Sequence, residues 1–320
     1  MLEAVNLTKR YGRTLAVDDV SFSIGKGETI GLIGRNGAGK SSVMRMLAGY
    51  IAPSGGRVMV DGVDMADDHI TAARRIGYMP ETPPLYLDLT VWEHIMYVAS
   101  LRGIRGRRAR GETERVCGAA GVSDVRARLI RNLSKGYRQR VGFASAMVGA
   151  PGLIILDEPT AGLDPGQIAD LRELVASLSR DASFVISSHI LPEISSMCSR
   201  IMILHRGRLA EDGSPEEIAR RHSGPPAVDM EITGPPDEAR DAVARAGGVI
   251  TSEERLAGGV TRFRIAIGAP DAGASEDGSL ALRRAVFKAV AGGRGLAIVA
   301  MRPVERTLED VFIGITERAE

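Results

Sequence analysis

Hydrophobic residues follow two patterns along the chain, and the alternation of the two predicts its elements. Short runs that are apolar almost without interruption are typical of parallel strands buried on both faces of a sheet. Between residues 89 and 147 the pattern becomes mainly helical, which predicts an inserted helical subdomain. The continuous apolar runs are Thr29–Gly34, Gly152–Asp157, Ser183–Ser188 and Arg200–His205.

One further run, Leu15–Ile24, alternates apolar and polar residues. A period of two predicts an antiparallel strand with one exposed face. Because short strands and helical stretches alternate from residue 1 to about residue 218, this part of the chain is predicted to be an α/β domain.

A linker is predicted at residues 219–227, because Gly and Pro gather in the stretch His222–Ala227. Residues 228–320 then restart the pattern as strand, helix, two strands, helix and strand, followed by a last helix. This split βαβ order predicts a small C-terminal α+β domain with a ferredoxin-like fold, in which we find no catalytic constellation. The expected elements are Val228–Thr233, Pro236–Ala246, a hairpin over Val249–Ile267, a flexible stretch at 268–278, Ser279–Ala291, Leu296–Met301 and Thr307–Thr316.

The charge and the apolar stretches limit the classes of partner. The chain of 320 residues has 41 Lys and Arg against 40 Asp and Glu, a net charge of +1, so no nucleic acid is expected as a partner. The longest uncharged stretch, Val141–Leu156, is short for a membrane span and contains Pro151 and Gly152. No signal peptide is expected at the start. Cys117 and Cys198 fit no metal or redox spacing, which favours reduced thiols in a cytosolic protein.

Residues 34–41, GRNGAGKS, match the phosphate-loop pattern G-x-x-x-x-G-K-[ST] between an apolar strand and a helical run. The glycines let backbone N–H groups converge on phosphate oxygens at the positive end of the helix. Lys40 is expected to reach the β- and γ-phosphates, and the Ser41 hydroxyl to bind Mg²⁺. The candidate ATP-binding residues of this loop are Gly34, Arg35, Asn36, Gly37, Ala38, Gly39, Lys40, Ser41 and Ser42.

Two adjacent acids follow the apolar run of residues 153–156. Strand ends of this kind are where α/β sheets place ligands, so Asp157 is expected to hold Mg²⁺ through a water. Glu158 is suited to orient and deprotonate the attacking water. Taken alone, such a pair also fits a solvated turn, and the phosphate loop is what favours the catalytic interpretation.

The stretch LSKGYRQR, Leu133–Arg140, resembles the LSGGQ signature of the ABC ATPase family, with Lys135 and Tyr137 in place of glycine and glutamine. The resemblance covers residues 1 to about 218 and implies the ABC form of the phosphate-loop NTPase fold. It also implies that Ser134, Lys135, Gly136 and Tyr137 bind the γ-phosphate of ATP held by the opposite subunit. Ser134 alone fits a plain helix N-cap equally well.

Other positions also resemble the family's motifs in order. Tyr11 corresponds to the aromatic residue that stacks on adenine, and Asp164, in the stretch AGLD, to the loop that crosses the dimer interface. His189 corresponds to the switch histidine that contacts the γ-phosphate, although a lone histidine at a strand end is usually a polar loop residue. Glu81 stands where most members carry a glutamine that ligates Mg²⁺ and senses the membrane partner, so this change is expected to affect coupling more than hydrolysis.

The combination of GYMPE, which ends at Glu81, with LSKGYRQR and with TLEDVFIGIT near the C-terminus looks most like the ATPases of ABC-2-type exporters of the gliding-motility-associated kind. This implies the catalytic set Lys40, Glu158 and His189, the cofactors ATP and Mg²⁺, and a second copy or a related ATPase subunit. It also implies an ABC-2-type permease, with the chain peripheral on the cytoplasmic face of the membrane.

Some alternatives stay open at this level. A soluble ABC ATPase acting on DNA, ribosomes or cofactor assembly is the second functional hypothesis, but long coiled coils and a second cassette are absent from the sequence. An inert scaffold conflicts with the intact catalytic set. Residues 82–95 correspond to the region beside the partner-binding groove, while Leu89 and Trp92 also fit the subdomain's own core. The basic stretch Arg102–Arg115 fits either a solvated face or anionic lipid.

Overall fold

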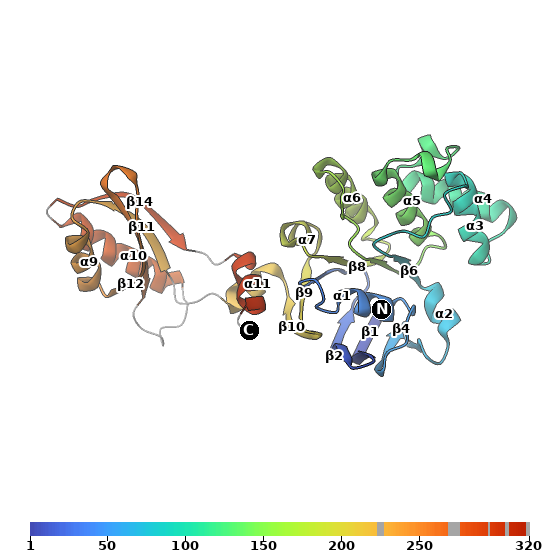
Figure 1. Ribbon diagram of the computed structural model, residues 1–320, viewed down its shortest axis with the longest axis horizontal. Coiled ribbons are helices and arrows are strands. Elements are labelled where there is room, and N and C mark those ends of the chain that lie inside the picture. The colour runs from blue at the N-terminus through green and yellow to red at the C-terminus, as the bar shows by residue number, and fades with distance from the viewer. Residues whose placement is uncertain (223–226, 268–275, 294, 305–306, 318–320) are drawn as a thin grey trace. The chain divides into compact units, whose positions relative to one another are not determined.

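The computed structural model describes residues 1–222, 227–267, 276–293, 295–304 and 307–317 (Figure 1). It divides into two compact units. The first comprises Met1–Pro215 with the C-terminal segment that begins at Phe312, and the second comprises Glu216–Val311.

The centre of the first unit is a six-stranded sheet in the order β10-β9-β3-β8-β7-β6. Its strands are parallel except for the edge strand β10. Every residue of β3, β7 and β8 is buried, which explains their unbroken apolar sequence. The strands are β3 (Thr29–Ile33), β6 (Ile76–Met79), β7 (Leu153–Leu156), β8 (Ser183–Ser188), β9 (Arg200–His205) and β10 (Arg208–Gly213).

A second, antiparallel sheet has the order β2-β1-β4-β5, and the buried side chains of β1, β2 and β4 join those of α1 and of the parallel sheet in one core. The alternating run predicted as an antiparallel strand is β2, whose burial alternates over its C-terminal half. The elements are β1 (Leu2–Tyr11), β2 (Thr14–Ile24), β4 (Gly55–Val60), β5 (Val63–Asp64) and α1 (Lys40–Leu47).

The predicted helical subdomain is present as three helices grouped together in Figure 1: α3 (Val91–Leu101), α4 (Gly106–Ala119) and α5 (Lys135–Met147). A capping box formed by Thr90 and Glu93 begins α3. Leu89 and Trp92 are only half-buried, and the subdomain core takes Val91 and Ile95 instead. The other helices of the first unit are α2 (His69–Arg74), α6 (Pro165–Leu178) and α7 (Leu191–Met197).

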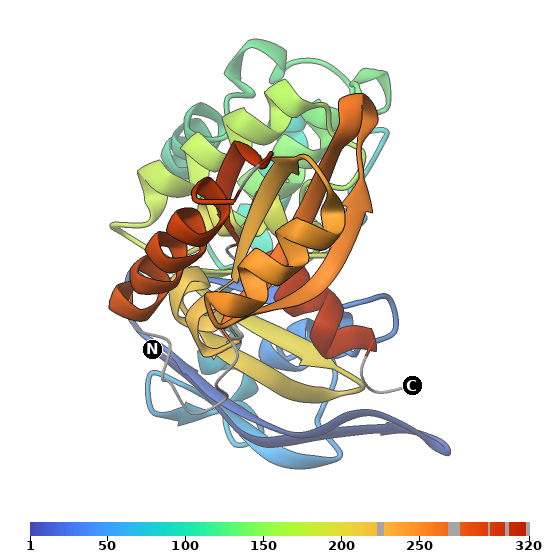
Figure 2. The same cartoon turned by 90° about the vertical axis from the view of Figure 1, so that its left-hand side faces the viewer.

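The second unit contains the predicted split βαβ pattern. Its sheet is antiparallel in the order β12-β13-β11-β14, and residues of both α9 and α10 share its core, so both helices cover one face (Figure 2). This order is that of a ferredoxin-like fold. The elements are β11 (Ala227–Thr233), α9 (Pro236–Arg245), β12 (Gly248–Arg255), β13 (Val260–Ile267), α10 (Glu276–Ala291) and β14 (Ala297–Val304).

The boundary between the units differs from the sequence expectation. Helix α8 (Pro215–Arg221) occupies residues 219–221 of the expected linker, and acidic residues in its first turn and arginines in its last turn complement its dipole. The first unit therefore ends at Pro215, not at residue 218, and the last helix α11 (Leu308–Glu317) divides between the units. Residues 223–226 and 268–275, predicted as linker and flexible stretch, lie outside the described residues. In the described part of the chain, no helix has the length and apolar character that a membrane span needs.

Candidate functional site

The phosphate-loop residues connect β3 to α1, and packing dictates where the loop needs glycine. A Cβ on Gly34 would lie 2.5 Å from the carbonyl oxygen of Leu204, and one on Gly39 would lie 2.4 Å from that of Ala16. Gly39 also has a φ of 104°, which side chains disfavour. The loop is therefore packed against β9 at Gly34 and against β2 at Gly39.

Lys40 is the first residue of α1, and its side chain folds back over the loop. It is 7% exposed, and its Nζ donates to the carbonyl of Gly34 at 2.8 Å and lies 3.5 Å from that of Arg35. The Lys side chain is flexible and its ammonium group has three N–H donors. The Lys40 ammonium can therefore exchange these carbonyl contacts for contacts to a phosphate.

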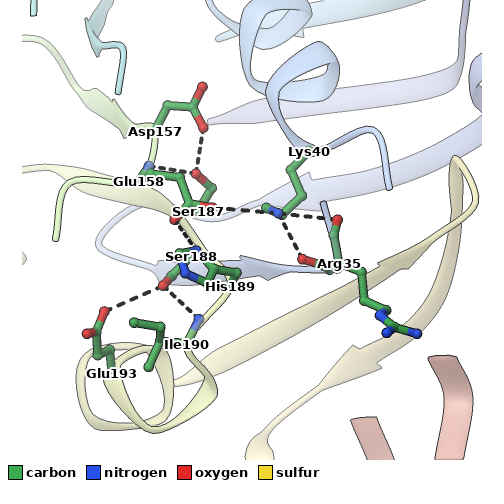
Figure 3. Close-up of polar contacts among 10 residues, drawn as sticks. Arg35, Lys40, Asp157, Glu158, Ser187, Ser188, His189, Ile190 and Glu193 are labelled. Atoms are coloured by element: carbon green, nitrogen blue, oxygen red, sulfur yellow. Dashed lines mark hydrogen bonds and ion pairs between the residues drawn. The ribbon is translucent and has the colours of Figure 1, made fainter. Parts of the chain in front are cut away.

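The two acids follow β7, and their environments differ. Asp157 is 3% exposed and accepts a hydrogen bond from Ser187 Oγ at 2.7 Å. Glu158 has a φ of 48°, and its carboxylate lies in the loop region between Lys40 and His189 (Figure 3). Its Oε1 is 3.6 Å from Lys40 Nζ, and its Oε2 is 2.7 Å from His189 Nδ1.

These groups surround a cavity of about 310 Å³ in front of the phosphate loop. A carboxylate between an ammonium and an imidazole is placed to accept a proton there, and the loop N–H groups and Lys40 offer positive potential for an anion. The lining residues are Asn36, Gly37, Ala38, Gly39, Lys40, Ser41, Ser42, Glu81, Glu158, Ala161 and His189.

The structure thus brings together most of the predicted site. Asp157 lies beside the cavity without lining it, tied to Ser187. Tyr11 is 45% exposed, with its hydroxyl 3.4 Å from Ser42 Oγ and the Lys9 Nζ 5.3 Å from its ring centroid, so its ring stands open at the edge of the loop.

The signature-like residues lie at the N-terminus of α5. Among the described residues that line the cavity, none comes from residues 133–140. Ser134 is the N-cap of α5, accepting from the N–H of Tyr137 at 3.3 Å, so its cap role is present. The Tyr137 hydroxyl donates to Asp124 at 3.0 Å, which raises the pKa of Tyr137.

The signature-like loop lies beside the segment that holds Asp164. A Cβ on Gly136 would lie 2.6 Å from the side chain of Gln167, and one on Gly162 would meet the Lys135 ammonium. Asp164 caps α6 through a capping box with Gln167. The two loops are therefore packed against each other on the same chain, and Ala161, next to Gly162, lines the cavity.

Two polar residues of the site region are not among the candidates that the motifs indicate. Ser187 holds both acids, and Gln139 of α5 donates to the carbonyl of Glu81 at 3.3 Å. The only available signals were a pair of serines ending an apolar strand and a glutamine buried in a helix.

A larger cavity of about 510 Å³ lies between the Pro-rich loop and the helical subdomain. Tyr86 and Tyr97 line it with their rings edge to face, and His94 lies below them, 2% exposed. Burial lowers the pKa of His94, so its imidazole is neutral near pH 7. Arg102, from the basic stretch, also lines this cavity, and its guanidinium donates to the carbonyl of Ile76 at 2.8 Å.

Comparison with known proteins identifies relatives of this chain. The family model for the ABC transporter matches residues 17–161. The bacitracin transport ATP-binding protein BcrA of Bacillus licheniformis is 36% identical over 224 residues, 69% of this chain and 72% of that protein. The linearmycin resistance ATP-binding protein LnrL of Bacillus subtilis is 32% identical over 235 residues, 73% and 76% of the two chains. A solved ATP-binding subunit of an ABC transporter matches with a TM-score of 0.63 and 33% identity, over 69% of this chain and 92% of that one.

Proposed function

The chain belongs to the ABC transporter family as an ATP-binding, ATP-hydrolysing subunit, and we propose that two copies close around ATP to drive an ABC-2-type export permease. The permease acts from the membrane and the chain from its cytoplasmic face. The observation that supports hydrolysis best is the Glu158 carboxylate between Lys40 and His189 at the cavity.

In this proposal the residues of the cavity divide the work. The loop N–H groups and Lys40 bind the β- and γ-phosphates, and Tyr11 stacks on the adenine. Glu158 takes the proton of the attacking water, and His189 orients that carboxylate and faces the γ-phosphate. Lys40 neutralises charge that develops on the transferred phosphoryl group.

The donors for Mg²⁺ are oxygens, which suit that ion. The Ser41 hydroxyl and the Glu81 carboxylate line the cavity. Asp157 accepts the Ser187 hydrogen bond with Oδ1, so its Oδ2 is available to a metal ion. These residues would hold Mg²⁺, which neutralises phosphate charge when bound.

The cavity of one chain lacks the signature-like loop, and this supports a shared site. Ser134 and Gly136 begin α5, where a hydroxyl, backbone N–H groups and the positive helix end offer contacts to a phosphate. In a dimer, with Asp164 at the interface, the loop of one copy would close the cavity of the other. The second copy is this chain or a related ATPase subunit.

The partner-facing surface in the proposal is the 510 Å³ cavity, hereafter the aromatic groove. Its wall is formed by Tyr78, Pro83, Tyr86, Tyr97, Leu101 and Arg102. Exposed aromatic and apolar side chains in a concavity suit an apolar helix of a partner. Export is supported by the two relatives, whose names state bacitracin transport and linearmycin resistance. The likeness to gliding-motility ATPases rests on the motifs alone.

A detergent pull-down tests the partner. The tagged chain should retain a polytopic permease from solubilised membranes, and Leu101→Glu should lose it, because a charge would enter the groove where Leu101 is 68% exposed. Hydrolysis by the isolated Leu101→Glu subunit should stay at the wild-type level, since the groove lies outside the nucleotide cavity. Retention of ribosomes or nucleic acid in place of a permease would favour a soluble ABC ATPase instead.

Glu81 is expected to act on coupling more than on the chemical step. It is exposed, lines the nucleotide cavity, and directly precedes the Pro-rich loop of the groove. Glu81→Gln keeps the size and removes one charge near the phosphates. Basal hydrolysis should change less than about tenfold, which is under about 1.4 kcal/mol in barrier.

The measurement compares ATPase rates of both forms, alone and with the reconstituted permease. Stimulation by the permease should change by a larger factor than the basal rate. If Glu81→Gln abolishes basal turnover and leaves the fold stimulation unchanged, Glu81 belongs to the chemical step.

A further inference from the structure

Ser187 is a buried hydroxyl at the end of β8, between the two acids and the histidine (Figure 3). It is fully buried, and β8 pairs with β7, the strand that precedes the acids, on one side and with β3, the strand that precedes the phosphate loop, on the other. Its side chain therefore lies under the cavity, at the point where the three loops of the site begin.

The hydroxyl makes two hydrogen bonds, one as a donor and one as an acceptor. Ser187 Oγ donates to Asp157 Oδ1 at 2.7 Å and accepts from the backbone N–H of Glu158 at 2.8 Å. A hydroxyl has one proton, and here that proton is committed to the Asp157 carboxylate. One atom thus fixes the side chain of the first acid and the backbone of the second.

The Glu158 backbone is where such an anchor matters. Its φ of 48° lies in the left-handed region, which a glutamate adopts unfavourably. This turn directs the Glu158 carboxylate toward His189 and Lys40. If the N–H of Glu158 lost this partner, the backbone would relax to a conformation of lower energy. The carboxylate would then move away from His189 and Lys40.

We infer that Ser187 is a positioning residue for hydrolysis, holding Asp157 and Glu158 in the geometry that the reaction uses. The inference rests on the hydrolytic roles proposed for these two acids. Ser187 itself does not reach the cavity, so it acts on the turnover step and leaves nucleotide binding to the phosphate loop.

An isosteric pair isolates the hydroxyl. Ser187→Thr keeps it and Ser187→Val replaces it by a methyl group of the same size. The Val variant should hydrolyse ATP about ten- to a hundredfold more slowly than the Thr variant, because hydrogen bonds to charged groups are the strong ones. Both should bind ATP with the same affinity within about threefold, since Lys40 and the loop are unchanged. If the Val variant does not fold, Ser187→Ala should show the same loss of turnover.

Ser183 offers a matched control on the same strand. It is 1% exposed, and its Oγ also donates once and accepts once, to the carbonyl of Gly25 at 2.8 Å and from the N–H of Gly27 at 3.0 Å. Ser183→Ala should lower the melting temperature about as much as Ser187→Ala does, and keep turnover within about threefold of wild type.

The outcomes distinguish the role of Ser187 from the proposed function. Equal turnover of the Val and Thr variants, or an equal loss of turnover in Ser183→Ala and Ser187→Ala, would overturn the positioning role. Wild-type protein and Glu158→Gln are measured beside them. If wild type does not hydrolyse ATP, the proposed function fails, and if Glu158→Gln turns over normally, the proposed role of Glu158 as the base fails.

Discussion

Glu158→Gln will lower ATP turnover at least about 10²-fold, the lower range for the loss of a general base. The Glu158 carboxylate is hydrogen-bonded to His189 at 2.7 Å and forms an ion pair with Lys40 at 3.6 Å. These contacts place it at the cavity. An amide keeps the size and the contacts to these neighbours but is not a base. ATP binding should remain, because the phosphate loop and Lys40 are untouched, and an ATP-bound dimer should accumulate.

The measurement is steady-state hydrolysis, with ATP affinity and the oligomeric state in ATP recorded on the same samples. Glu193→Gln is the matched control, because Glu193 lies on α7, near Ser188 at 3.5 Å, outside the cavity lining. It should hydrolyse ATP at the wild-type rate. Turnover by Glu158→Gln close to that of wild type would remove Glu158 from the mechanism.

The sequence predicts those parts of the site that local pattern determines. The phosphate loop needs its glycines and Lys40 in consecutive order, and Asp157 follows directly on an apolar run, so strand, loop and helix can be recognised from neighbours alone. The same holds for the buried strands β3, β7, β8 and β9, whose apolar runs all correspond to strands in the structure.

The remaining features depend on contacts between distant segments. Ser187 is 30 residues from Asp157, and its two hydrogen bonds exist only because β7 and β8 pair in one register. The left-handed turn at Glu158 has no glycine to announce it. Likewise, α8 continues through residues that the sequence assigned to a linker, since the charges at its two ends stabilise a helix there.

Ser134→Arg should remove hydrolysis as completely as the loss of the base, at least about 10²-fold, although Ser134 does not line the cavity of its own chain. In the proposed dimer the arginine would fill the space that the γ-phosphate of the opposite copy needs, at the N-terminus of α5. Isolated chains should bind ATP as wild type does, because the phosphate loop is intact.

A control for this substitution is Ser177→Arg, at an exposed position on α6 where the hydroxyl donates only to the carbonyl of Leu174. It introduces the same side chain without entering the proposed interface, so hydrolysis should stay near the wild-type rate. If Ser134→Arg hydrolyses ATP as fast as Ser177→Arg, the signature-like loop has no part in turnover.

In the proposed dimer each catalytic site joins the phosphate loop of one copy to the signature-like loop of the other, and a mixture of two inactive variants tests this arrangement. Lys40→Ala and Ser134→Arg subunits are each expected to be inactive. In their heterodimer one site carries both changes and the other carries neither. Mixed in equal amounts, they should recover about a quarter of the wild-type rate, since half of the dimers are mixed and each has one intact site. No recovery, with heterodimers demonstrated in the same sample, would contradict the shared site.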